Sequence, residues 1–380
     1  MSAETVFSNA RVVLEDRIID GSVVINDGMI VDIDEGVSSV GDDFDGDYLL
    51  PGLIELHTDH IEGHYAPRPR VKWNPHAAVL AHDAQIAASG ITTVFDALRL
   101  GMDEQATEEA NHMRLLADAI DEGLKRDRLR ADHFIHLRCE VSASDCVDAF
   151  RQFENDERVK LASLMDHSPG QRQFANPEAY RVYYQGKTGM SDEAFEAFSK
   201  ARIEASEKYS NAHRVAIAEA CHERGIVLAS HDDATIDHVN EALEQGIRVA
   251  EFPTTEEAAK ASHDGGLAVL MGAPNVVRGG SHSGNVAAQR LAEKGHLDIL
   301  SSDYIPFSLI QAVFHLCSKN DELALTDTVK MVSANPAKAV SLDDRGSIDV
   351  GKRADLIRVR VDDDAIPVIR SVWRQGSRVL

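Results

Sequence analysis

The middle of the chain repeats one pattern eight times: a short apolar segment rich in β-branched residues, then a stretch with helical periodicity. The eight strand-like segments span residues 49–57, 90–98, 133–141, 159–167, 225–233, 248–254, 267–274 and 297–304. One intervening helical pattern, "AHRVAIAEACHERG", stops at Gly225, a residue typical of helix ends. Eight strands alternating with helices over about 250 residues predict an α/β fold, a (β/α)8 TIM-type barrel whose active site lies at the C-terminal strand ends.

The two ends of the chain share a different pattern. Short segments of alternating apolar and polar residues, separated by Asn-Asp-Gly and Asp-Gly turns, run from Val6 to Leu50. The same pattern of short strand-like segments and turns returns in "GSIDVGKRADLIRVRVDDDAIPVIRSVWRQGSRVL". We therefore predict one small β-sandwich domain built from residues 1–50 and 346–380. The metal-dependent barrel would then occupy residues 51–345.

Net charge, apolar runs and cysteine spacing limit the kinds of partner that the protein is expected to bind. The formal charge of −24 disfavours a general affinity for nucleic acid or for anionic membranes, which would require the opposite sign. No apolar run approaches the ~18 to 20 residues that span a bilayer, and the four cysteines form no C-x-x-C pair. We expect a cytoplasmic protein with reduced cysteines that acts on a small molecule, and a homo-oligomeric state is left open.

Several predicted strands end in side chains that bind metals. Residues two apart on a strand share a face, so His57 and Asp59 are expected to point together into the barrel mouth, and the same spacing aligns His136, Arg138 and Glu140. Imidazole and carboxylate groups are the usual ligands of catalytic zinc, manganese or iron. The candidate metal ligands are His57, Asp59, Glu140, His167, His231 and Asp303.

Each of these side chains also has a purely structural interpretation. A single strand-end His is often a hydrogen-bonded structural residue, and Asp before a helix is commonly an N-cap. We interpret Asp232 and Asp233 as caps or as groups that orient ligands, and His60 and His64 as loop residues. Glu251 is an alternative to Glu140. The convergence of strand ends favours a metal site, because unpaired His and carboxylate groups are costly without a cation or a network.

The order of these motifs resembles the amidohydrolase superfamily. The chain has a β-rich start, then "LLPGLIELHTD" with Pro-Gly, an acidic residue and His57, an Asp on the eighth strand, and a return through "NPAKAVSLDDRGSIDVGKRADLI". Asp59 stands where the superfamily has a second His, and no lysine for carboxylation is evident. The number of divalent ions, one or two, and their identity, zinc with manganese or iron as alternatives, therefore stay open.

Longer motifs narrow the resemblance to diphosphatases of the carbon-phosphorus lyase pathway: "ELHTDHIEGHYAPRPRVKW", "SLMDHSPGQRQF", "LASHDDAT" and "LMGAPNVVRGGSHSGN". The resemblance implies cleavage of a phosphorylated sugar's 5′-triphosphate to a monophosphate and pyrophosphate. Asp303 is expected to be the base that takes the proton of the attacking water. Two alternatives remain: an amidohydrolase that cleaves a C–N bond, such as a deacetylase or a cyclic-amide hydrolase, and a non-enzymatic barrel scaffold.

A triphosphate also needs cations, since the whole chain is strongly acidic. Arginine is the preferred phosphate ligand because its planar fork donates two bonds at once. The candidate substrate-binding residues are Arg68, Arg70, Lys72, Arg172, Arg278 and His282. A solvated basic loop at 68–72 and a plain flexible loop around Gly279 and Gly280 are the alternative interpretations.

Overall fold

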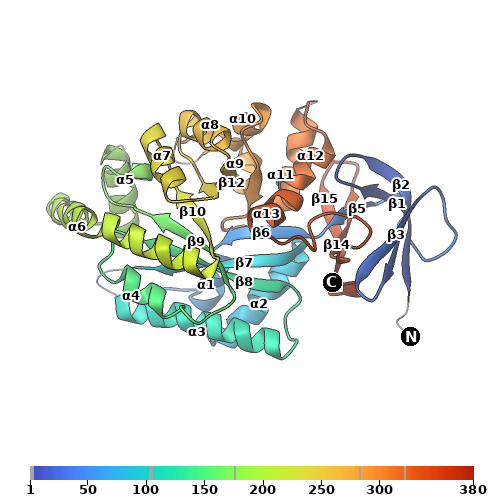
Figure 1. Cartoon of the computed structure of the whole chain (residues 1–380), viewed down its shortest axis with the longest axis horizontal. Helices are drawn as coiled ribbons and strands as arrows, with labels where there is room; N and C mark the ends of the chain where they lie inside the picture. Colours follow the sequence, from blue (N-terminus) through green and yellow to red (C-terminus); the bar gives the residue numbers. More distant parts are fainter. Residues whose placement is uncertain (1–3, 102–105, 175–176, 282–283, 321) are drawn as a thin grey trace.

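Eight parallel strands form the centre of the molecule (Figure 1). The computed structural model describes residues 4–101, 106–174, 177–281, 284–320 and 322–380. The barrel strands are β6 (Leu53–Thr58), β7 (Ile91–Leu100), β8 (Asp132–Glu140), β9 (Val159–Met165), β10 (Val227–His231), β11 (Val249–Glu251), β12 (Ala268–Gly272) and β13 (Ile299–Ser301). They pair in chain order from β6 to β13, so each strand-like segment of the sequence has become the neighbour of the next.

The barrel closes between β6 and the end of β13. A parallel bridge joins Thr58 to Asp303, and the amide of Asp303 donates to the carbonyl oxygen of His57 at 3.1 Å. The buried carboxylate of Glu55 accepts from Ser301 Oγ and from the Ser302 amide, both at 2.6 Å. This closure carries the C-terminal ends of the first and last strands to the same place.

Helices cover the outside of the barrel (Figure 1). They are α1 (His60–Tyr65), α2 (Pro75–Ala88), α3 (Ala106–Lys125), α4 (Cys146–Arg151), α5 (Pro177–Thr188), α6 (Asp192–Arg224), α7 (Ile236–Glu244), α8 (Glu256–Asp264), α9 (Ala273–Arg278), α10 (Ala288–Glu293), α11 (Ser308–Lys319), α12 (Leu325–Lys330) and α13 (Ala334–Ala339), with a 3-10 turn at Arg172–Phe174. Helix α6 ends at Gly225 in the left-handed conformation, as predicted. No helix among the described residues is both long and apolar enough to cross a membrane.

Both ends of the chain build a second sheet. Its strands are β1 (Thr5–Val13), β2 (Ile18–Asn26), β3 (Met29–Glu35), β4 (Asp42–Asp43), β5 (Tyr48–Pro51), β14 (Leu356–Val361), β15 (Pro367–Arg374) and β16 (Ser377–Arg378). The ends join where β5 pairs antiparallel with β14, with Leu50 opposite Ile357. Figure 1 shows the blue N-terminal strands beside the red C-terminal strands.

The small β-domain has its own aromatic core. Phe7, Phe44 and Trp373 are buried together, with ring centroids 4.5 to 5.9 Å apart. Residues from opposite ends of the chain therefore share one hydrophobic cluster. The predicted fold class, a (β/α)8 barrel with a small β-domain from both termini, is confirmed, and the exact boundaries at 50/51 and 345/346 stay a prediction.

An ion cluster ties the barrel to the returning C-terminal segment. Asp132, at the start of β8, accepts from Arg345 at 2.7 Å and lies 2.8 Å from Arg353 and 3.5 Å from Arg374. Burial alone would raise the pKa of Asp132, but Arg353 and Arg345 lower it below its ordinary value. The carboxylate is therefore ionised and paired at neutral pH.

We expect Asp132→Asn to lower the free energy of unfolding by about 1.5 to 3 kcal/mol at pH 7, the usual worth of a charge-assisted hydrogen bond. Because the folded pKa is depressed, this contribution is present above the unfolded pKa of about 4 and is lost as pH falls through the folded value. Denaturant unfolding at pH 7 and at low pH measures it. The matched control is Asp127→Asn, which removes an exposed partner of Arg374 and should change little.

Candidate active site

A polar cavity of about 260 Å³ opens at the C-terminal ends of the barrel strands. Its walls include His57, His167, His231, Asp232 and Asp303 from four strand ends and the turns that follow them, together with Arg99, Arg138 and Arg278. Four of the six predicted ligands thus meet in one cavity, and Asp59 and Glu140 are not among its lining residues. The parallel barrel brings them together because all its strands end on the same side.

Glu251, at the end of β11, is the carboxylate at the base of this site. His57 Nδ1 donates to Glu251 Oε1 at 3.2 Å, and His231 Nδ1 donates to Oε2 at 3.0 Å. Ser163 Oγ adds a bond of 2.7 Å, and His136 Nε2 lies 3.6 Å from Oε1. Since Glu251 uses the Nδ1 protons of two rings, the Nε2 lone pairs of His57 and His231 are free for another partner.

A second carboxylate, Glu140, holds His167 in the same way. His167 Nδ1 donates to Glu140 Oε2 at 2.6 Å, while Glu140 Oε1 accepts from the His167 amide and from Ser142 Oγ. Both oxygens of Glu140 are therefore occupied behind the ring. The ligand role predicted for Glu140 stays a prediction, and its contacts favour positioning of His167 instead.

The ring of His167 faces Asp232 on its other side. Its Nε2 lies 3.4 Å from Asp232 Oδ2, and His231 Nε2 lies 3.5 Å from the same oxygen. Burial disfavours the charged ring, but Glu140 and Asp232 raise the pKa of His167 to about 9. Asp232, interpreted from the sequence as a cap or orienting group, thus lines the cavity between two histidines.

Two groups of side chains at this mouth fit a metal ion. His57, His136 and Glu251 form one, and His167, His231 and Asp232 form the other; in each, one donor atom per residue lies within 4.8 Å of the others. Nitrogen and carboxylate oxygen donors of this kind suit zinc, manganese or iron. The donor set therefore fits the divalent metal that the sequence predicts.

Asp59 and Asp303 lie close to each other beside His57, since the Asp303 amide donates to the His57 carbonyl oxygen and the Asp59 amide donates to the Asp303 carbonyl oxygen. Arg138 Nη1 donates to Asp59 Oδ2 at 3.1 Å, so Asp59 is paired with a cation rather than with the histidines. Burial raises the pKa of Asp303, His57 opposes the rise, and Asp59 adds to it. Asp303 is thus a carboxylate with increased proton affinity on the cavity wall, which is the property a general base needs.

The backbone turns sharply at three positions around the site. Asp232, Phe252 and Asp303 have φ of 60°, 53° and 57°, a conformation uncommon for residues other than glycine. Phe252 packs edge-on against His57 at 5.0 Å and His231 at 5.3 Å between ring centroids. Strained backbone of this kind concentrates at functional sites, where the surrounding structure holds it in place.

The predicted phosphate-binding residues lie at different places relative to the cavity. Arg278, at the end of α9, lines the cavity, whereas Arg68, Arg70 and Lys72 are exposed beyond α1 and are not among its lining residues. Arg172 is buried and pairs with Asp233 and Glu241, so direct contact with substrate would require both carboxylates to be displaced. The prediction for His282 lies outside the described residues.

The expectation that His60 and His64 are loop residues was wrong. Both lie in the short helix α1, where a spacing of four residues places them on one face with ring centroids 4.8 Å apart. The prediction also missed Arg99 in the cavity wall. Strand β7 runs to Leu100, two residues beyond the end predicted for it, so Arg99 lies within the strand rather than after it.

Comparisons with known proteins find similar sequences and similar folds. A model of the Amidohydrolase family matches residues 66–380. The chain is 47% identical over 377 residues to alpha-D-ribose 1-methylphosphonate 5-triphosphate diphosphatase of Escherichia coli (strain K12), which covers 98% of this chain and 100% of that protein. This similarity extends over both the barrel and the terminal β-domain.

Solved structures resemble the chain along its whole length. N-acetylglucosamine-6-phosphate deacetylase from Pasteurella multocida has a TM-score of 0.64 at 15% identity and covers 99% of each chain. 5-methylcytosine deaminase from Klebsiella pneumoniae has a TM-score of 0.66 at 14% identity, with 99% of this chain and 98% of the other covered. At such identities the likeness supports the fold alone.

We expect Glu251→Gln to weaken binding of a divalent metal by at least about tenfold, because partners that orient ligand histidines are typically worth ~10 to 100-fold in metal affinity. Equilibrium dialysis against zinc, followed by metal analysis, measures the change. Glu244→Gln, an exposed residue of α7, is the control and should bind zinc like the unmodified protein. Equal zinc affinity in both variants would contradict the role given to Glu251.

Proposed function

Because the chain belongs to the amidohydrolase family, we propose that it is a metal-dependent diphosphatase that cleaves alpha-D-ribose 1-methylphosphonate 5-triphosphate to the 5-phosphate and pyrophosphate in phosphonate degradation. The observation that carries the proposal is a full-length relationship at 47% identity to the diphosphatase of that name. The cavity supports it independently, since metal-binding groups and arginines line the same walls.

We assign the metal to the histidine side of the cavity. His57 and His231 would offer Nε2 atoms, and His167 would offer Nε2 once the metal displaces its proton, with Asp232 as the carboxylate ligand and Glu251 behind His57 and His231. A bound divalent ion supplies Lewis-acid chemistry: it lowers the pKa of water from ~15.7 toward ~7 and offsets charge on phosphate oxygens. Zinc is the proposed ion, with manganese or iron as alternatives, and one or two ions are within the proposal.

The residues of the chain do the remaining work. Asp303 takes the proton of the attacking water, because burial raises its proton affinity and its backbone is held against His57 by the barrel closure. Arg138 keeps Asp59 paired beside it. Asp303 therefore accepts the proton at a fixed position next to the metal-binding histidines.

Arginines would receive the phosphates. A triphosphate approaching a chain of net charge −24 is repelled unless local cations reverse the field. Arg99, Arg138 and Arg278 provide that reversal within the cavity, and Gly279 and Gly280 follow Arg278 with positive φ. Arg68, Arg70 and Lys72 belong to the proposal as an outer basic segment that meets the substrate before it enters.

A cytoplasmic location is a prediction from the sequence alone, and the sequence leaves open whether the chain forms a homo-oligomer. A direct role of Arg172 also rests on the sequence, and its carboxylate partners Asp233 and Glu241 make it the weakest member of the predicted set.

Product analysis in heavy-oxygen water tests the reaction itself. We expect the triphosphate to give pyrophosphate and the 5-phosphate, with one heavy oxygen in one of the two products, because a single water opens one anhydride bond. Mass spectrometry identifies the bond and the phosphorus attacked. Release of inorganic phosphate alone, or turnover of N-acetylated or cyclic-amide substrates with none of the triphosphate, would favour a different hydrolase.

Asp303→Asn should retain the metal and the substrate but lose turnover, because an amide does not accept a proton from the attacking water. Zinc content, substrate binding by calorimetry and kcat separate the three effects. Asp237→Asn, an exposed carboxylate of α7, is the control and should keep all three. Full activity in Asp303→Asn would move the base to another residue.

Arg278→Ala should lower kcat/KM for the triphosphate about tenfold to a hundredfold, the equivalent of one charge-assisted bond worth ~1.5 to 3 kcal/mol. Metal content should not change. Arg290→Ala is a matched control on α10, where the guanidinium pairs with Glu256 away from the cavity. If both variants hydrolysed the triphosphate like the unmodified chain, the phosphate role of Arg278 would be withdrawn.

A further inference from the structure

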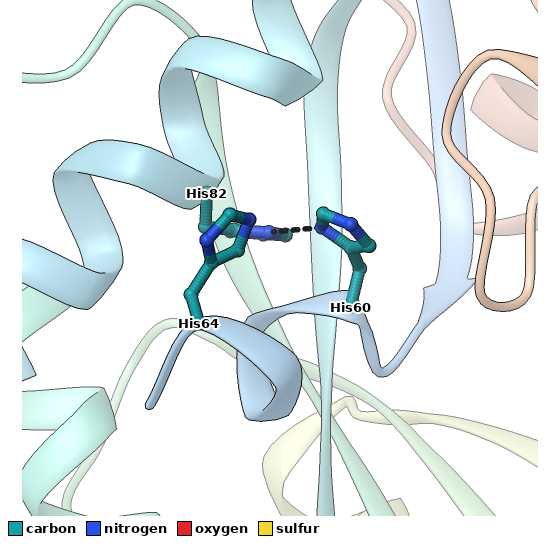
Figure 2. A group of neighbouring side chains, drawn as sticks. All are labelled: His60, His64 and His82. Atoms are coloured by element: carbon teal, nitrogen blue, oxygen red, sulfur yellow. Dashed lines mark hydrogen bonds between the residues drawn. The ribbon is translucent and has the colours of Figure 1, made fainter. Parts of the chain in front are cut away.

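Three histidines meet between helices α1 and α2. Figure 2 shows the rings of His60, His64 and His82 turned toward one another, with His60 and His64 on α1 and His82 on α2. Their ring centroids are 4.8 to 6.2 Å apart, and one nitrogen from each lies within 4.8 Å of the others. None of the described residues that line the cavity at the barrel mouth belongs to this group.

The closest pair of nitrogens has the spacing of two ligands on one ion. His60 Nδ1 and His82 Nδ1 are 3.3 Å apart. In a tetrahedral zinc site with Zn–N bonds of ~2.0 to 2.1 Å, two ligand nitrogens lie ~3.3 Å apart. The distance between these two nitrogens therefore matches the separation of two ligands on one ion.

The carboxylate of Asp96 fixes the orientation of His82. His82 Nε2 donates to Asp96 Oδ1 at 2.7 Å, and His133 Nδ1 donates to Asp96 Oδ2 at 2.8 Å. Burial opposes ionisation, but His133 and His82 hold the pKa of Asp96 well below its ordinary range. With Nε2 bound to a carboxylate, the Nδ1 lone pair of His82 faces His60, which is the carboxylate–histidine–metal arrangement.

The third ring supplies an atom that lacks a partner. His64 Nε2 is buried and has no hydrogen-bond partner among the described residues. A buried polar nitrogen without a partner is costly, so an unfilled ligand position is a physical reason for it. Burial, aided by His82, also lowers the pKa of His64, so its ring is neutral and able to ligate.

We propose that His60, His64 and His82 bind a divalent transition metal ion of the zinc type, with a fourth position open to water, at a site separate from the barrel mouth. The ion would fasten α1 to α2. Because α1 leads directly into residues 66–73, it would also anchor the segment that presents Arg68, Arg70 and Lys72. The purely structural alternative is a His60–His82 hydrogen bond together with a hydrogen bond between Gln85 and the His64 ring, which leaves His64 Nε2 without a partner among the described residues.

Anomalous diffraction at the zinc absorption edge tests the proposal directly. Crystals of the full chain are grown with zinc chloride after chelator treatment. We expect a peak at bonding distance, ~2.0 to 2.1 Å, from one nitrogen of each of the three rings, in addition to density at the barrel mouth. Zinc at the barrel mouth alone, with none between α1 and α2, would overturn the proposal whatever the outcome for the proposed function.

Metal counting in solution provides a second test. His60→Ala and His64→Ala should each bind one equivalent of zinc less than the unmodified chain after loading and gel filtration. His76→Ala removes a half-exposed histidine of α2 that pairs with Glu122, and it should bind as much zinc as the unmodified chain. Circular dichroism of the metal-free proteins confirms folding. Equal zinc content in all four proteins would refute the site.

Discussion

The closure of the barrel between β6 and β13 is the constraint on which the rest of the site depends. Glu55 is fully buried and accepts hydrogen bonds from Ser301 Oγ, the Ser302 amide and the His57 amide, so it joins the first strand to the last across 246 residues of sequence. Burial raises the pKa of this carboxyl. Without this junction, His57 and Asp303 would not lie on one wall, and the strand ends would not share a cavity.

The closed barrel also places buried carboxylates behind the histidines at the strand ends. Glu251 accepts hydrogen bonds from the Nδ1 atoms of His57 and His231, and Glu140 accepts one from His167 Nδ1. Each ring therefore presents its second nitrogen toward the cavity. Isolated charges at this depth would be expensive, and each carboxylate is therefore surrounded by donors. The histidines and carboxylates stabilise one another and hold the donor geometry that a metal requires.

The charge of the whole chain and the charge of some cavity-lining side chains have opposite signs. The chain carries −24 overall, yet Arg99, Arg138 and Arg278 line the walls of the site. Inside a cleft with walls of low dielectric, such local cations act over short distances while salt screens the distant acidic surface. The proposed polyanionic substrate would therefore be attracted to the arginines of the cavity rather than to the acidic surface.

The sequence by itself determined what depends on local patterns: eight alternating strand segments, the helix end at Gly225, the β-rich character of both termini, and strand-end positions for His57, His231 and Asp303. Only the tertiary structure decided which side chains meet. Glu251 lies 194 residues from His57, and neither periodicity nor spacing reports such a contact, because it depends on the register of the closed barrel. The same reason explains the burial of Arg172 beside Asp233 and the meeting of His82 with α1.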